Sequence, residues 1–331
     1  MDLKIAIVNS SSFGRRFPEH MERLRRIGTV ERVRVAGDCH GAELAEALAP
    51  YDIVISSVTP FFDEEFFSVK RDLLAIVRHG IGYNNVDVPA ATAAGTLLTI
   101  VSPLVERDAV AEGSVALLMD VMRHVSDSRE AGNRGRWADR GSFVGAGLSG
   151  KTLGIVGCGN IGTRVAEILG RGFGMEVLAC DPVPRPEWAE AEGVSYVGLD
   201  ELLGRADAIS LNASLNETSF HILDADALAL AARTPYVVNC ARADLVDQGA
   251  MLAALDSGRV AGYACDVMHD EPPAADDPYF NHANVVVTTH ISAYTAECLR
   301  GMGDKCVADV ERLVAGKAAV NSVNGAELGM A

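Results

Sequence analysis

The stretch Thr152–Pro182, TLGIVGCGNIGTRVAEILGRGFGMEVLACDP, decides the fold of the chain around it. An apolar run predicts a buried strand, and Gly157, Gly159 and Gly162 follow it with G-x-G-x-x-G spacing. One glycine permits a tight turn, the next lets the backbone approach a pyrophosphate, and the third lets a helix pack on the strand. The pattern predicts a strand-helix-strand unit whose helix N-terminus binds the phosphates of a dinucleotide.

A second apolar run ends at Asp181, about 20 residues after Gly162, where a carboxylate can accept hydrogen bonds from both ribose hydroxyls. The same carboxylate repels a 2′-phosphate, so the spacing favours NAD over NADP. Asn160 and Ile161, between the glycines, are expected to join the cofactor site. An ordinary turn aspartate is the alternative for Asp181. FAD and S-adenosylmethionine sites share the fingerprint, so the motif leaves the reaction open.

The composition is that of an ordinary soluble globular protein, and 331 residues predict two domains. The net charge of -16 argues against nucleic-acid and anionic-membrane partners, which attract basic surfaces. The seven cysteines include no C-x-x-C pair and no zinc-type spacing, which predicts reduced thiols in a cytoplasmic protein and no metal site. The N-terminal apolar run is too short for a signal peptide or a membrane span.

Short β-branched runs alternate with longer helical patterns, which is typical of parallel sheets in α/β folds. A long amphipathic helix is expected over 107–125, a glycine-rich loop over 131–150, and a last helix over roughly 293–315. The expected strands form two series, 4–8, 52–56 and 73–77, then 152–157, 176–180, 207–212, 236–240, 260–267 and 284–289.

Three charged or titratable residues follow strands of the second series: Arg242, Glu271 and His290. In an open α/β sheet the loops after the carboxyl ends of the strands form the ligand crevice. Hydride transfer to a carbonyl group needs a proton donor near pH 7 and a cation for the substrate carboxylate. A surface arginine, a salt-bridged glutamate and a structural histidine are the plain alternatives. At one edge of one sheet, the three together favour catalysis.

The sequence resembles the D-isomer-specific 2-hydroxyacid dehydrogenase family, which includes phosphoglycerate, glyoxylate and D-lactate dehydrogenases, over essentially the whole chain. The resemblance implies two Rossmann-like, doubly wound parallel-sheet domains with a cleft between them. A flavodoxin-like substrate domain would comprise 1–101 plus 296–331, and an NAD-binding Rossmann domain 102–295. The stretches that carry it are GIGYNNVDVPAATAAG (80–95), VERDAVAEGSVALLM (105–119), RGRW (134–137), LSGKTLGIVGCGNIG (148–162), VVNCARADLVDQGAM (237–251), YACDVMHDEPP (263–273) and TTHISAYT (288–295).

The resemblance implies that the protein interconverts a 2-oxo acid and its D-2-hydroxy acid with NAD. His290 would protonate the carbonyl oxygen, and Glu271 would pair with the imidazole and hold its orientation. Arg242 would bind the substrate carboxylate and carbonyl groups, where a planar cation suits a bidentate partner. Asp266 would hold the nicotinamide carboxamide, with a turn aspartate as its alternative, and Ala241 would line the cofactor site.

Two further features follow from the resemblance. The backbone amides of Ile81 and Gly82 would cradle the substrate carboxylate, although an ordinary strand-to-turn glycine pair is the alternative. The helix 107–125 and the arm that carries Trp137 would form a homodimer interface. A corepressor-like, NAD(H)-sensing binding protein with little turnover remains the alternative function.

Some residues depart from the family pattern and bear on the substrate. Thr289 stands where many members have proline before the histidine, so the pocket shape changes there. The loop 56–67 carries no cation and no C-terminal regulatory domain is expected, so a phosphorylated substrate is disfavoured. Phe61 and Phe62 could line an apolar pocket for the substrate side chain, but a role in the core or in an interface is favoured. Near the carboxylate loop, Arg78 and His79 would provide a second cation or be solvated.

Overall fold

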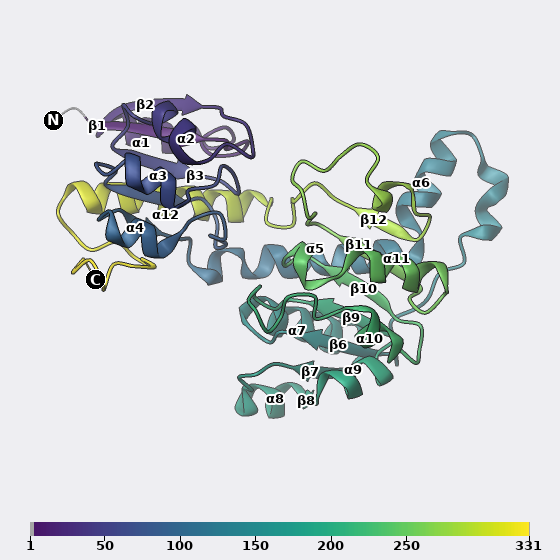
Figure 1. The fold of residues 1–331 in the computed structure, drawn as a ribbon. Coiled ribbons are helices and arrows are strands. Elements are labelled where there is room, and N and C mark those ends of the chain that lie inside the picture. The colour runs from purple at the N-terminus through teal and green to yellow at the C-terminus, as the bar shows by residue number, and fades with distance from the viewer. Residues whose placement is uncertain (1–2, 331) are drawn as a thin grey trace. The chain divides into compact units, whose positions relative to one another are not determined.

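The computed structural model describes residues 3–330 and divides the chain into two compact units (Figure 1). Residues 3–106 with 294–330 form the first unit, and residues 107–293 form the second. The domain boundaries expected from the sequence lay a few residues away, at 101/102 and 295/296. Each unit contains one all-parallel sheet, as expected for doubly wound α/β domains.

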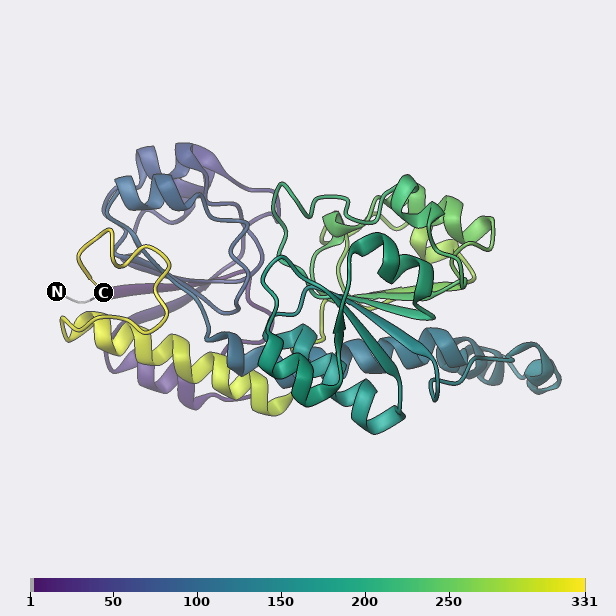
Figure 2. The same cartoon turned by 90° about the horizontal axis from the view of Figure 1, so that it is seen from below.

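The first unit is built on a five-stranded sheet of order β2-β1-β3-β4-β5, the flavodoxin-like order. Its strands are β1 (Leu3–Val8), β2 (Gly28–Val33), β3 (Ile53–Ser56), β4 (Ala75–Arg78) and β5 (Leu97–Thr99). Its helices are α1 (Glu19–Arg25), α2 (Gly41–Ala47), α3 (Glu64–Val69), α4 (Val88–Ala93) and α12 (Ala296–Val314). Figure 2 shows α12, in yellow, on one side of this sheet and the blue helices α2 to α4 on the other.

Alternation along the strands explains these two layers. In β1, Ile5 and Ile7 belong to the core with α1 and α12, whereas Ala6 and Val8 belong to the core with α2 to α4. Helix α12 contributes a fully buried apolar side, including Val307, to the first of these cores. The last helix of the chain therefore completes a core that is otherwise formed by the first hundred residues.

The second unit contains a seven-stranded sheet of order β12-β11-β10-β9-β6-β7-β8, which is the Rossmann order extended by one strand. Its strands are β6 (Thr152–Val156), β7 (Glu176–Cys180), β8 (Ser195–Tyr196), β9 (Ala208–Leu211), β10 (Tyr236–Asn239), β11 (Gly262–Cys265) and β12 (Val285–Val287). The helices are α6 (Val125–Asn133), α7 (Asn160–Phe173), α8 (Pro186–Glu192), α9 (Leu199–Arg205), α10 (Ala225–Ala229) and α11 (Gln248–Asp256), with 3₁₀ turns η1 (Trp137–Ser142), η2 (Ala243–Leu245) and η3 (Pro278–Asn281). Helix α5 (Pro103–Arg123) begins in the first unit and continues into this one.

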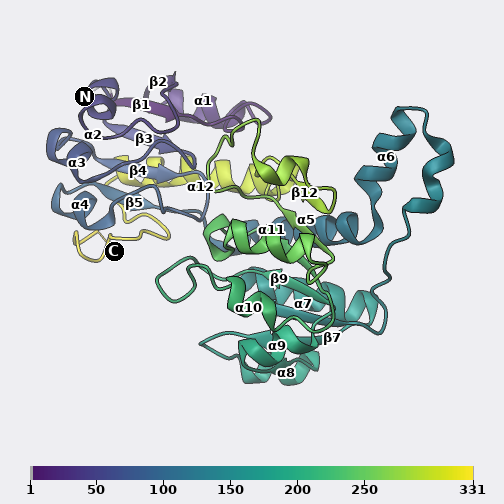
Figure 3. The same ribbon diagram turned by 45° about the vertical axis from the view of Figure 1, so that its right-hand side comes forward.

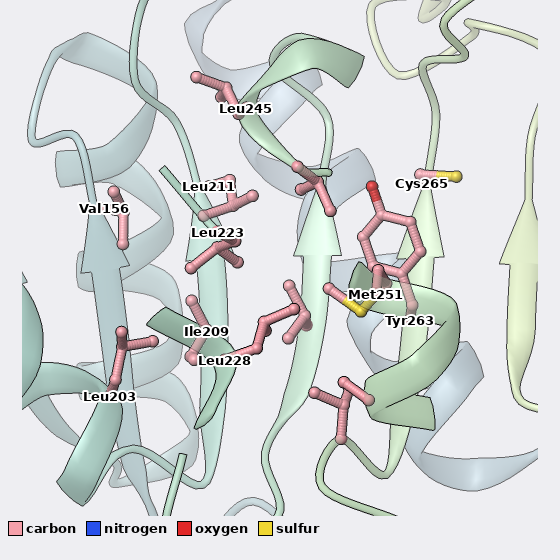
Figure 4. Packing of buried hydrophobic residues seen from close by; sticks show 14 of the residues in the cluster. Val156, Leu203, Ile209, Leu211, Leu223, Leu228, Leu245, Met251, Tyr263 and Cys265 are labelled. Carbon is pink, nitrogen blue, oxygen red and sulfur yellow. The ribbon is translucent and has the colours of Figure 1, made fainter. Parts of the chain in front are cut away.

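Apolar side chains fill both faces of the second sheet. On one face α9, α10 and α11 pack against the strands through Leu203, Leu228 and Met251, beside the fully buried Tyr263 (Figure 4). On the other face α5 and α7 pack against the strands. Because both faces are covered, most of these strands are nearly continuous apolar runs, and this explains why all of them except β8 were predicted from the sequence.

The predicted glycine-rich loop over 131–150 is only partly correct. Helix α6 extends to Asn133 and η1 covers Trp137–Ser142, so helical structure reaches into the segment. Helix α6 has one buried residue, Ala131, and η1 has no buried residue. Neither element therefore shows the apolar stripe by which a helix is predicted from sequence. Figure 3 shows α6 standing off the sheet of its unit. Among residues 3–330, no helix is long and apolar enough to cross a lipid bilayer.

Arg78 and His79 at the end of β4 are both buried, so of the two alternatives for these residues, solvation is wrong. The His79 ring packs edge-on against Phe13, with 5.3 Å between ring centroids. Burial, reinforced by the positive charge of Arg78 and the nearby His20, lowers the pKa of His79 to about 3. His79 is therefore neutral near pH 7 and does not supply the second cation considered above.

The buried His79 makes stability depend on pH. In the unfolded chain, a histidine has a pKa of about 6.5. Below that pH the unfolded chain therefore binds a proton at His79 that the folded chain excludes. This stability is fully present above pH 6.5 and is lost toward pH 3, at about 1.4 kcal/mol per pH unit. In urea unfolding between pH 7.5 and pH 5, wild type should lose about 2 kcal/mol more than His79→Gln. Equal losses would show that His79 does not control this dependence.

Candidate active site

The glycine loop between β6 and α7 has the shape that a pyrophosphate requires. Gly157 has a φ of +92°, and a Cβ atom there would lie 2.5 Å from the backbone nitrogen of Ala213. A Cβ at Gly162 would collide with the carbonyl oxygen of Gly157, whereas a Cβ at Gly159 would meet nothing within 4 Å. Gly159 is also the N-cap of α7 and provides no side-chain cap, which leaves the first helical amides for an anion.

Asp181 directly follows β7, at the edge where the glycine loop lies. Its Oδ2 accepts a hydrogen bond from the amide of Cys158 at 2.6 Å, and its Oδ1 accepts one from the amide of Val183 at 2.7 Å. Each carboxylate oxygen can accept a further hydrogen bond, so Asp181 fits the ribose hydroxyls of NAD. Asn160 and Ile161 occupy the first turn of α7, next to the loop.

His290 and Glu271 lie together at the carboxyl edge of the second sheet. The imidazole Nδ1 of His290 lies 2.7 Å from Oε2 and 3.0 Å from Oε1 of Glu271. Oε1 of Glu271 also accepts a hydrogen bond from the amide of Met268 at 3.1 Å. Because the carboxylate engages Nδ1, the opposite ring nitrogen, Nε2, is the atom that can exchange a proton with a substrate.

Asp266 accepts hydrogen bonds from residues on both sides of His290. Its Oδ1 accepts hydrogen bonds from the Thr288 hydroxyl at 2.6 Å and the Ile291 amide at 2.8 Å. Its Oδ2 accepts one from the Ser292 amide at 2.6 Å, and the side chain is buried. These bonds support the left-handed backbone of His290, whose φ is +57°. The expected contact of Asp266 with a nicotinamide carboxamide stays a prediction.

Arg242 lies in a turn that Asn239 organises from the end of β10. The side-chain oxygen of Asn239 accepts a hydrogen bond from the Ala241 amide at 3.0 Å, and its amide nitrogen donates one to the Arg242 carbonyl oxygen at 2.8 Å. The Asp266 amide donates to the Asn239 carbonyl oxygen at 3.0 Å, which joins this turn to the next strand. The turn of Arg242 and the His290 segment are thus organised from two hydrogen-bonded neighbours, β10 and β11.

Asn239 was not identified from the sequence, although an amide at the end of an apolar strand was a usable signal, because such an amide is buried and needs hydrogen-bond partners. The role of Phe62 was also open. Phe62 is buried and packs edge-on against Phe66 at 5.1 Å between ring centroids, so it belongs to the core. Phe61 is about half exposed.

The loop expected to cradle a carboxylate follows β4 in the first unit. The Gly80 carbonyl oxygen accepts a hydrogen bond from the Val101 amide at 3.1 Å. The Ile81 amide donates to Oε1 of Glu106 at 3.1 Å. An amide of this loop therefore binds a carboxylate oxygen within the chain itself, whereas the contacts of Ile81 and Gly82 with a substrate stay predictions. Glu106 was not identified from the sequence.

Comparison with known proteins supports the same reading of the second unit. Residues 115–292 match the family model described as "D-isomer specific 2-hydroxyacid dehydrogenase, NAD binding domain". The chain is 33% identical over 308 residues to D-3-phosphoglycerate dehydrogenase of Methanocaldococcus jannaschii, covering 93% of this chain and 58% of that protein. It is 33% identical over 284 residues to glyoxylate reductase of Korarchaeum cryptofilum, covering 85% of each.

A solved structure extends the likeness to both units. D-lactate dehydrogenase from Aquifex aeolicus, complexed with NAD and lactic acid, matches with a TM-score of 0.81 and 25% identity, covering 94% of this chain and 96% of that one. The chain spans only about half the length of the phosphoglycerate dehydrogenases that it matches, between 47% and 58% for three of them.

Proposed function

The chain belongs to the D-isomer-specific 2-hydroxyacid dehydrogenase family, and we propose that it interconverts a 2-oxo acid and its D-2-hydroxy acid. Its cofactor is NAD, which the open glycine loop and the carboxylate of Asp181 fit. The observation that carries the proposal is the hydrogen-bonded pair of His290 and Glu271. The His290 segment is held from the end of β11, and the turn of Arg242 follows the neighbouring strand β10. A titratable donor and a cation at one sheet edge are what reduction of a 2-oxo acid needs.

Each catalytic residue has a distinct role in this proposal. When bound, the oxidised cofactor NAD accepts a hydride from the hydroxy acid, and the reduced cofactor NADH donates one to the oxo acid. His290 holds a proton on Nε2 and gives it to the carbonyl oxygen during reduction, then takes it back during oxidation. The Glu271 carboxylate stabilises the charged imidazolium and keeps the ring oriented. Arg242 binds the substrate carboxylate and polarises the carbonyl oxygen through its planar guanidinium.

The substrate is proposed to be an unphosphorylated 2-oxo acid. The loop 56–67 contains no lysine, arginine or histidine that could bind a phosphate. His79, close to the carboxylate loop, is neutral near pH 7 and adds no cation for a second anionic group. The amides of Ile81 and Gly82 are proposed to bind the single carboxylate, and the Ile81 contact with Glu106 supports this choice.

A homodimer and a cytoplasmic location are also proposed. Exposed apolar side chains gather on and beside the arm after α5, where Val125, Trp137 and Val144 are all more than half exposed. Large exposed aromatic and aliphatic side chains on a projecting segment favour an interface with a partner. The molar mass of the purified chain in solution tests the homodimer, and an active monomer would contradict it.

A panel of 2-oxo acids, assayed with NADH and separately with NADPH, tests the function. Glyoxylate and pyruvate represent the unphosphorylated class, and 3-phosphohydroxypyruvate represents the phosphorylated one. We expect turnover of unphosphorylated acids with NADH. With pyruvate, whose reduction product is chiral, chiral chromatography should show D-lactate. Tight NADH binding without turnover of any acid would favour the sensor alternative, and a preference for the phosphorylated acid would contradict the proposed substrate class.

A further inference from the structure

The amide of Ile81 already holds a carboxylate in this structure. Helix α5 places Glu106 in its first turn, and Oε1 of Glu106 accepts the Ile81 amide at 3.1 Å. Both residues belong to the first unit, so the contact lies within one compact body. The Ile81 amide can therefore bind a carboxylate oxygen, and in this structure that oxygen belongs to Glu106.

The surroundings of the loop favour an anion. The guanidinium of Arg78 is buried, and its Nη1 lies 3.2 Å from where a Cβ of Gly80 would be. Within residues 3–330, the amide of Gly82 has no hydrogen-bond partner. A buried cation and a second amide thus lie in the same loop as the Ile81 amide, and both favour an anion there.

A substrate carboxylate that reaches these amides meets the negative charge of Glu106. Two carboxylates a few ångströms apart repel each other, strongly so where water is partly excluded. We propose that Glu106 is an internal competitor for the substrate carboxylate and sets the affinity of the loop for anionic substrates. The inference rests on the proposed function, because it concerns the carboxylate of the same 2-oxo acid.

Glu106→Gln separates this role from a merely structural one. Glutamine keeps the size of the side chain and an oxygen that can accept the Ile81 amide, but it removes the charge. If Glu106 only holds the loop in place through its hydrogen bond to Ile81, the variant should have the KM and the oxamate inhibition constant of wild type. If Glu106 competes with the substrate, the variant should bind anions more tightly with its catalytic residues unchanged.

The experiment measures kcat and KM for the preferred 2-oxo acid and the inhibition constant of oxamate, an unreactive anionic analogue. In Glu106→Gln, KM and the oxamate inhibition constant should both fall about tenfold, as when one like charge is removed nearby. The value of kcat should stay within about twofold, and the Kd of NADH should not change. Glu22→Gln, an exposed glutamate of α1 in the same unit, makes the same charge change and should match wild type.

An unchanged or raised KM in Glu106→Gln, with Glu22→Gln at wild-type values, would overturn the inference. A fall in KM without a fall in the oxamate constant would also overturn it, because competition must act on both anions. If wild type turns over no 2-oxo acid, the proposed function fails, and titration of oxamate onto the NADH complex still tests Glu106. The failures of the two proposals are therefore distinguishable.

Discussion

Replacing His290 by asparagine is expected to lower kcat by about 10²–10⁴-fold, the range for a lost general acid. Asparagine cannot exchange a proton near pH 7, but it adopts left-handed backbone more readily than most residues. Since His290 has a φ of +57°, asparagine removes the proton donor without adding backbone strain. Stopped-flow measurement of NADH oxidation gives kcat, and the Kd of NADH should remain near that of wild type.

Two companion variants show whether the loss is chemical. His290→Ala should lose similar activity but should also lower the thermal midpoint, because alanine tolerates a positive φ poorly. Glu271→Gln keeps a hydrogen-bond acceptor for Nδ1 but lacks the charge that stabilises the imidazolium, so its kcat should fall by less. If His290→Asn retained more than a tenth of wild-type kcat, His290 would not be the acid.

Replacing Arg242 by alanine is expected to lower kcat/KM by about 10²–10³-fold, as when one partner of a desolvated charged pair is removed. KM should rise because the substrate carboxylate loses its cation, and kcat should fall because the carbonyl oxygen loses a donor. The backbone of the turn should survive, since Asn239 holds the carbonyl oxygen of residue 242 and the amide of residue 241. Steady-state kinetics with the preferred 2-oxo acid measures both constants.

Arg242→Lys provides the matched test of geometry. Lysine keeps the positive charge but lacks the planar fork, so we expect an intermediate kcat/KM. Arg25→Ala changes the net charge equally at an exposed position of α1 and should leave both constants unchanged. An Arg242→Ala enzyme with wild-type KM would show that Arg242 does not bind the substrate carboxylate.

Local patterns were enough to predict most of the sheets. The expected strands 4–8 and 176–180 correspond closely to β1 and β7, because a strand covered on both faces needs an unbroken apolar run. Strands β2, β5 and β8 were not predicted. Strand β2 has no buried residue and therefore no apolar run, and it forms by pairing with β1. Strands β5 and β8 contain only three and two residues and form by pairing with β4 and β7. Long-range pairing of this kind leaves little trace in a short segment.

Site residues were predictable where the chemistry admits few residue types. They were less predictable where their role depends on the path of the backbone in space. The glycine spacing, Arg242, Glu271 and His290 stood out because cofactor approach and proton transfer admit few residue types. The bonds from Asn239 could not be predicted, because they depend on the path of the backbone after β10.

The sequence by itself determined the fold class, the preference for NAD and the identity of the candidate catalytic residues. These depend on apolar periodicity and on motifs whose members lie close along the chain. Only the tertiary structure decided that Asp266 holds both flanks of His290, that His79 is buried and neutral, and that Glu106 occupies the Ile81 amide. The physical reason is that burial and hydrogen bonding depend on residues that meet only after folding, such as Glu106 and Ile81, which are 25 positions apart.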